Sequence, residues 1–213
     1  MKAVRVPWFG IALTLSTVAL EAATAYDHSL FPELQRHLAL DWQALERFEV
    51  YRIVVSPFIQ TSPGFSPTVL GLTTLVVPVY ELREGTRRAV TLFFTGDWLS
   101  TLPALFFLQA AGWLGNSAAA QLARTPDSGS SCGGFACMTA FLCTLPFRWR
   151  TAGFLTLVVF FAWRIALWHR LFDFQHALAA VAGVAVWRLL EARKSGWRQP
   201  VIQATPAATV VAG

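Results

Sequence analysis

The chain has 213 residues, of which 55% are apolar and only 14% are charged. Soluble domains carry about 25% charged residues, and a single soluble domain of this length could not bury so much apolar surface. This composition excludes a disordered chain, a coiled coil and a nucleic-acid-binding domain, and it predicts an all-α, multi-pass membrane protein. The net charge of +5 then fits Lys and Arg residues that anchor cytoplasmic loops rather than a polyanionic partner.

Six apolar segments approach the length of about 17–25 residues that a helix needs to cross the hydrocarbon core of a bilayer. They are Val6–Tyr26, Pro63–Tyr80, Val90–Leu114, Gly133–Phe147, Thr151–Trp168 and Phe174–Leu190. The fourth and sixth segments are short and the second contains several prolines, which is typical of spans that pack inside a helix bundle. The sequence therefore predicts a bundle of six transmembrane helices.

Basic residues lie on alternate connections between these segments, whereas the other connections are richer in acidic residues. The basic residues are Lys2, Arg5, Arg83, Arg87, Arg88, Arg148, Arg150, Arg193, Lys194 and Arg198. By the positive-inside rule, this alternation predicts that both termini are cytoplasmic. A signal peptide cleaved near Ala25 is the alternative for the first segment, but the alternation requires all six segments.

These segments form one predicted membrane domain over residues 1–195, in the cell membrane of a bacterium or in an endomembrane of a eukaryote. Residues 27–62 form a long outer loop. Its mixture of leucine, aromatic and charged residues predicts a helix that lies in the membrane interface. Residues 196–213 are rich in Ala, Thr, Pro and Val and carry almost no charge, which predicts a disordered tail.

The outer ends of two predicted helices carry polar residues of the types that act in catalysis. The fourth segment is preceded by Asp127-Ser128-Gly129-Ser130-Ser131-Cys132, and the sixth opens with Asp173-Phe174-Gln175-His176. A serine and a histidine at matching depth on neighbouring helices form the minimal arrangement for a base-activated nucleophile. Gly129 and Gly133 permit a sharp turn into a helix, and free backbone N–H groups at that helix start can stabilise an oxyanion.

A set of small residues follows the histidine of the sixth segment. His176, Ala179 and Gly183 are spaced three and four residues apart, so they share one helix face. Small side chains on such a face allow a neighbouring helix to approach closely. We therefore expect Ala179 and Gly183 to be helix-packing residues that bring the imidazole within reach of the next helix.

Several motifs then occur in order along the chain. They are Tyr51-Arg52 and Ser56-Pro57-Phe58 before the second segment, Glu81-Leu82-Arg83-Glu84-Gly85 at its end, Gly129-Ser130-Ser131, and His176 with Ala179 and Gly183. Over most of residues 6–191 this pattern resembles the rhomboid intramembrane serine proteases. The resemblance implies a six-helix rhomboid-like bundle with Ser131 as nucleophile and His176 as general base. It also implies transmembrane protein substrates and no cofactor.

The sequence departs from the rhomboid pattern beside the nucleophile and in the second helix. Cys132 follows Ser131 where the family has glycine, and Gly133 comes one residue later. The HxxxN of the second helix, which assists the oxyanion, is absent, and the loss of one such donor costs on the order of 10²–10³ in rate. These departures indicate a divergent branch in which Asp127 and Asp173 are further site candidates. The alternative is a catalytically inactive rhomboid-like protein that binds membrane-protein clients.

Simpler roles are open for the same residues. Ser131 can cap a helix, and Ser130 is the rival nucleophile. No group of His, Cys, Asp and Glu residues has the spacing of metal ligands, so no metal site is predicted. Asp97, inside the third segment, is expected to be a hydrogen-bonded structural residue. It stands alone among the apolar residues of the spans, which argues against a small transporter.

Overall fold

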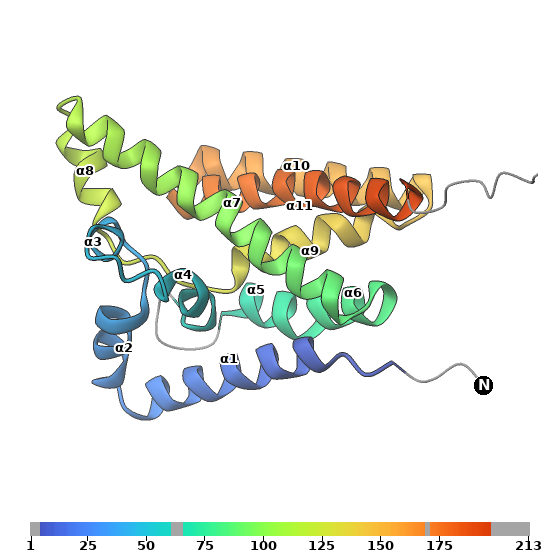
Figure 1. Cartoon of the computed structure of the whole chain (residues 1–213), viewed down its shortest axis with the longest axis horizontal. Helices are drawn as coiled ribbons and strands as arrows, with labels where there is room; N and C mark the ends of the chain where they lie inside the picture. Colours follow the sequence, from blue (N-terminus) through green and yellow to red (C-terminus); the bar gives the residue numbers. More distant parts are fainter. Residues whose placement is uncertain (1–4, 61–65, 169–170, 197–213) are drawn as a thin grey trace, which may run out of the picture.

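The computed structural model describes residues 5–60, 66–168 and 171–196. Within these ranges the chain is all-helical and contains no strand, which confirms the predicted fold class at this level. Four helices are long: α1 (Trp8–Tyr26), α7 (Thr86–Trp113), α10 (Phe147–Trp168) and α11 (Leu171–Gly196). In the described part of the chain, α1, α7 and most of α10 are long and apolar enough to cross a membrane (Figure 1).

The second predicted segment forms a continuous but irregular helix made of α5 (Pro67–Leu70), the π-helix η2 (Gly71–Val76) and α6 (Val77–Glu84). Pro78 explains the irregularity, because proline has no N–H to donate inside a helix. In the π register residue 78 would donate to the carbonyl of Thr73. The Thr14 hydroxyl of α1 donates to that carbonyl instead, at 2.9 Å, so the π turn is held by a neighbouring helix.

The short helix α9 (Ser131–Cys143) lies at the centre of the bundle, between α7 and α11 (Figure 1). Nearly all of its residues from Cys132 to Ala140 are buried. Close packing requires small residues here, since a Cβ on Gly133 would lie only 2.6 Å from the Phe93 ring of α7. A helix of 13 residues with glycines on its buried faces is therefore suited to the interior of a bundle rather than to contact with lipid.

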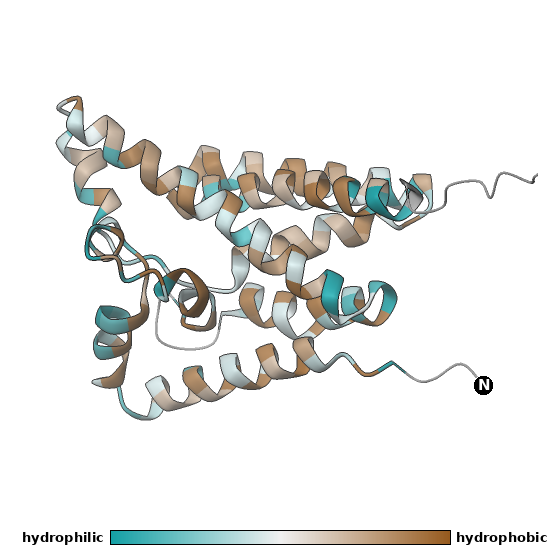
Figure 2. Cartoon of the chain, in the orientation of Figure 1, coloured by the Kyte–Doolittle hydropathy of each residue, from teal (hydrophilic) through white to brown (hydrophobic). Residues whose placement is uncertain are grey.

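The outward faces of the long helices are apolar. Figure 2 shows hydrophobic residues along their length, with hydrophilic residues concentrated at the helix ends and in the loops. The most exposed large apolar side chains on these faces include Trp8, Leu15, Phe107, Val159, Val181 and Leu189, each more than 60% accessible. Contiguous apolar surface of this extent fits a lipid environment and would be unfavourable in water. The predicted membrane location is therefore supported by both helix length and surface.

The basic segments lie together at one end of the bundle. Arg5 donates to the carbonyl of Arg83 at 3.5 Å, and Arg83 donates to the carbonyl of Thr144 at 2.7 Å. Arg88 reaches Glu191 near the end of α11 at 2.5 Å. These contacts place the start of the chain, the α6–α7 turn, the α9–α10 turn and the end of α11 at the same end (Figure 1).

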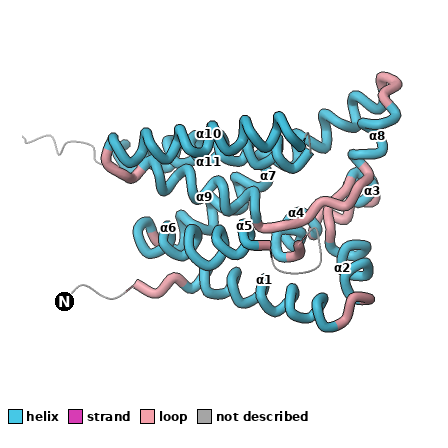
Figure 3. The backbone as a smooth tube through the Cα atoms, turned by 180° about the vertical axis from the view of Figure 1, so that it is seen from behind, coloured by secondary structure: helices cyan, strands magenta, loops and turns pink. Residues whose placement is uncertain are grey.

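The longer connections gather at the opposite end of the bundle (Figure 3). The segment predicted as an interfacial helix is instead divided into α2 (Leu30–Leu38), α3 (Trp42–Glu46), α4 (Arg52–Val55) and the 3₁₀ turn η1 (Ser56–Phe58). The single-helix prediction was wrong because the backbone is extended at Ala39 and Asp41 and has a positive φ of 60° at Phe48, and neither conformation continues a helix. A further short helix, α8 (Ser117–Ala123), was not predicted.

Three predicted boundaries also need correction. The fourth segment was expected to begin at Gly133 and to end at Phe147, but α9 begins at Ser131 and ends at Cys143. Phe147 starts α10, because Pro146 favours the first turn of a new helix over the continuation of the old one. Gly196, assigned to the disordered tail, ends α11. The rest of that tail lies outside the described residues, as do Lys2 and Pro63.

Candidate active site

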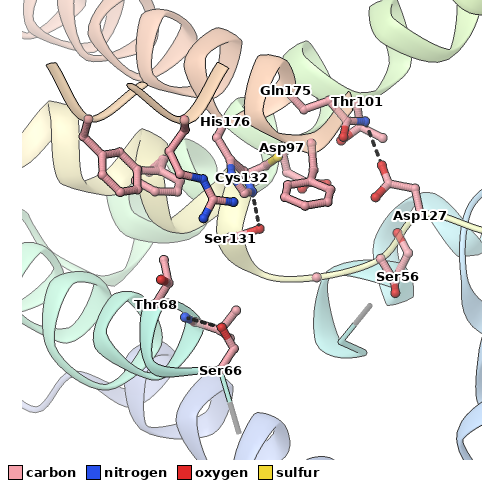
Figure 4. A pocket seen from close by; sticks show the side chains of 17 residues that line it. Ser56, Ser66, Thr68, Asp97, Thr101, Asp127, Ser131, Cys132, Gln175 and His176 are labelled. Carbon is pink, nitrogen blue, oxygen red and sulfur yellow. Dashed lines mark hydrogen bonds between the residues drawn. The ribbon is translucent and has the colours of Figure 1, made fainter. Parts of the chain in front are cut away.

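The hydroxyl of Ser131 and the imidazole of His176 meet between α9 and α11. The Ser131 Oγ lies 2.7 Å from Nε2 of His176, a hydrogen-bond distance for a nucleophile and its base (Figure 4). Ser131 is the first residue of α9, and His176 lies one and a half turns into α11. The two residues that the sequence singled out, 45 positions apart in the chain, are therefore direct partners.

A polar cavity of about 220 Å³ opens beside this pair. Its polar lining includes Ser56, Ser66, Thr68, Asp97, Thr101, Asp127, Ser128, Ser131, Arg164, Gln175 and His176 (Figure 4). Its apolar lining comes mainly from Phe135, Phe160 and Phe172. An ordered water needs only about 10–15 Å³ of such space, so the cavity has room for water together with part of a substrate.

The backbone before α9 fixes the position of Ser131. Leu40 and Asp127 exchange two backbone hydrogen bonds of 2.8 Å, and the N–H of Gly129 donates to the carbonyl of Ser56 at 3.1 Å. Gly129 has a φ of +131°, a conformation that side-chain-bearing residues rarely adopt. These three tethers hold the chain as it turns into the helix. The first N–H groups of α9, up to Gly133, have no helical acceptor and lie at the serine.

Aromatic rings surround the imidazole of His176. The Phe135 ring centroid lies 4.9 Å from that of the imidazole, and the Phe172 centroid lies 5.9 Å away. These contacts keep the ring from turning away from Ser131. The sequence contained a signal for both, since Phe135 follows Ser131 by four residues and Phe172 precedes His176 by four, which places each pair on one helix face.

The small residues of α11 make the close helix contact that the sequence predicted for this face. Ala179 is fully buried. A Cβ on Gly183 would collide with the backbone of Ala136 and with the hydroxyl of Thr139 on α9. The backbones of α9 and α11 therefore approach closely about two turns along α11 from His176, and this approach sets the distance between the two side chains.

The two acidic site candidates have different partners. Asp173 is 1% exposed and accepts from Nε of Arg164 at 2.8 Å. Asp127 accepts from Nε2 of Gln175 at 2.8 Å. Neither is hydrogen-bonded to His176 in the described structure, so neither serves as the third member of a triad. Burial raises the pKa of Asp127 to about 6, although hydrogen bonds from Gln175 and from the Ser128 N–H act to lower it.

Asp97 lines the same cavity and is only 6% exposed. Its carboxyl group has no hydrogen-bond donor among the described residues. The expectation of a hydrogen-bonded structural aspartate was therefore wrong. Its position beside Ser131 could not be read from the sequence, because it depends on the angle at which α7 crosses α9.

The simpler roles fit the geometry less well. Neither Ser130, at the cap position of α9, nor the Ser131 hydroxyl caps the helix, and Ser130 Oγ is buried without a partner in the described part of the chain. Cys132, Cys137 and Cys143 are all free thiols. The described residues include no group of three or more His, Cys, Asp and Glu side chains placed to hold a metal ion. His169, weighed as a ligand, lies outside the described residues.

Comparisons of the chain with family models, with curated proteins and with solved structures found no match.

Proposed function

We propose that the chain is a rhomboid-like intramembrane serine protease that cleaves membrane-anchored proteins with a Ser131–His176 dyad. The observation that carries the proposal is the 2.7 Å contact between Ser131 Oγ and His176 Nε2 at the wall of a polar cavity. A structural histidine needs neither a hydroxyl at the start of a helix nor space for a substrate. A nucleophile and its base need both.

The proposed reaction begins with His176 accepting the proton of the Ser131 hydroxyl while Oγ attacks the carbonyl carbon of the scissile peptide. The N–H groups of Ser131, Cys132 and Gly133 stabilise the resulting oxyanion. The intermediate collapses as His176 returns the proton to the departing amine, which leaves an acyl ester on Ser131. Water, activated by the same imidazole, then hydrolyses this ester and restores the hydroxyl.

The same proposal includes a six-span arrangement with both termini in the cytoplasm. α1, α7 and α10 would be joined by the α5–η2–α6 helix, α9 and α11 as spans in a rhomboid-like bundle. The gathering of Arg5, Arg83, Arg88 and Arg193 at one end supports this orientation, since basic residues concentrate on the cytoplasmic side. The dyad would then open toward the extracytoplasmic side.

Cleavage in proteoliposomes tests this proposal. The purified protein is reconstituted with a single-span reporter and compared with Ser131→Ala and, as a matched control, Ser16→Ala, whose hydroxyl bonds only within α1 at 2.9 Å. We expect cleavage by wild type and Ser16→Ala and none by Ser131→Ala. If no variant cleaves, but wild type and Ser131→Ala retain the reporter equally, the inactive client-binding protein is the correct alternative.

A further inference from the structure

We infer that the cavity beside Ser131 is a specificity pocket for a cationic side chain, Lys or Arg, at or next to the bond that is cleaved. The inference rests on the proposed protease function and adds the class of substrate side chain. It comes from the carboxyl groups that the cavity encloses and from what they lack.

Asp97 is the central observation. It is a carboxyl group 94% removed from solvent in the middle of an apolar helix, it faces the cavity, and no donor within the described residues bonds to it. Burying a carboxylate without a partner is costly. Residues that destabilise a fold in this way are retained where they have a function. A cation of a bound ligand would supply the partner that the Asp97 carboxylate lacks among the described residues.

The charges around Asp97 point to the same ligand. Among the described residues that line the cavity, Asp97, Asp127 and Arg164 carry formal charge besides the titratable His176. The Arg164 guanidinium is bonded to the buried carboxylate of Asp173 at 2.8 Å, so that pair is neutral as a whole. Asp127 receives only the neutral amide of Gln175. The two remaining carboxyl groups leave the cavity with a negative character that no described cation of this chain offsets.

The remaining lining suits a long side chain with a charged end. Phe135, Phe160 and Phe172 supply apolar surface for the methylene groups of Lys or Arg, and Thr101 adds a hydroxyl near the carboxyl groups (Figure 4). Side chains of this type commonly place the stem on apolar surface and the charge in a polar site. Because Ser131 lines the same cavity, a side chain that reaches Asp97 belongs to a residue close to the attacked carbonyl.

Binding of a side-chain analogue tests the pocket without any need for catalysis. The affinity of the full-length protein for butylguanidinium is compared with that for butylurea, which has similar size and no charge. We expect wild type to prefer the cation at least tenfold, and Asp97→Asn to reduce the preference below threefold. The matched control is Asp27→Asn, an exposed carboxyl group that bonds only to Ser29 and should keep the full preference. Asp127→Asn provides a second variant if Asp97→Asn does not fold.

A reporter series then places the pocket relative to the cleaved bond. Membrane-anchored reporters that differ only in Arg, Gln or Glu at the cleaved position should be cleaved in the order Arg, Gln, Glu, with at least tenfold between the first two. Equal binding of the two analogues, or an equal loss of preference in Asp27→Asn, would overturn the inference even if Ser131-dependent cleavage is found. Selective guanidinium binding without cleavage of any reporter would retain the pocket and refute the protease.

Discussion

Each end of the helix bundle buries a carboxyl group inside an apolar helix, and the two groups differ in their hydrogen-bond partners. At the end that carries the basic residues, Glu81 is 1% exposed and accepts from the N–H groups of Phe9 and Gly10 and from the Thr86 hydroxyl, at 2.6–3.1 Å. At the other end Asp97, equally enclosed by helices, has no described hydrogen-bond partner. Both residues are single carboxyl groups in an apolar bundle.

This difference separates structural charges from charges kept for a ligand. Glu81 caps the start of α1, because its carboxylate accepts from the first N–H groups of the helix, which have no intrahelical acceptor. It thereby joins α1 to α6. Arg88 similarly joins α7 to α6 through Glu84, and to α11 through Glu191 and the carbonyl of Leu190. At the cavity end, the Asp97 carboxyl and the Ser130 hydroxyl have no hydrogen-bond partner among the residues that the structure describes. Removal of the charge from Glu81 and removal of the charge from Asp97 should therefore have opposite consequences for stability.

The largest effect is expected at the base. His176→Ala should lower the rate of reporter cleavage by about 10³–10⁴, since the serine then has no proton acceptor, while the apparent melting temperature stays close to that of wild type. His37→Ala is the control, because His37 is exposed and its imidazole is hydrogen-bonded, among the described residues, to the exposed Glu33 alone. A His176→Ala protein that cleaves as fast as the His37 variant would refute the dyad.

Glu81→Gln should destabilise the fold by about 1.5–3 kcal/mol, the range for hydrogen bonds to charged groups, without changing cleavage per folded molecule. Asp97→Asn should leave the protein at least as stable as wild type, because it removes a buried charge and no described hydrogen bond. Thermal unfolding in detergent measures both. Equal destabilisation by the two substitutions would remove the distinction between the two ends.

A single substitution can increase the separation between α9 and α11. A Cβ on Gly183 collides with Ala136 and Thr139, so Gly183→Ala should cost about 1–3 kcal/mol of stability and should also slow cleavage by increasing the distance from Ser131 to His176. The matched control is Gly71→Ala, where no atom lies within 4 Å of the added Cβ and φ is −58°. That substitution should stabilise the helix slightly, by about 0.5–1 kcal/mol.

The last effect concerns Asp127 and depends on pH. Its pKa is about 6 in the folded protein, compared with 3.8 for an exposed carboxyl group, so the folded state favours the protonated form. The stability that this group contributes is present below pH 4 and is lost as the pH rises to about 6. Asp127→Asn should therefore gain stability relative to wild type over this window, by at most about 3 kcal/mol from a pKa difference of two. A difference in melting temperature that does not change between pH 4 and pH 7 would contradict this.

The sequence predicted the helices better than the loops, and the contact between Ser131 and His176 better than its surroundings. Apolar length and the spacing of His176, Ala179 and Gly183 are local properties, so they can be read along the chain. The division of the outer loop into short helices depends on the positive φ of Phe48 and on the pairing of Leu40 with Asp127. That pairing joins residues almost 90 positions apart, so it cannot be read from local sequence. The place of Asp97 in the cavity depends on helix crossing angles in the same way.

The most direct test of the central claim is the location of a covalent adduct. The detergent-purified protein is treated with a fluorophosphonate, which reacts with a hydroxyl only when a base activates it, and the modified peptide is identified by mass spectrometry. We predict one adduct, on Ser131, that disappears in His176→Ala. An unmodified wild-type protein, or an adduct on Ser130 or Cys132 that persists without His176, would contradict the assignment of Ser131 and His176 as nucleophile and base.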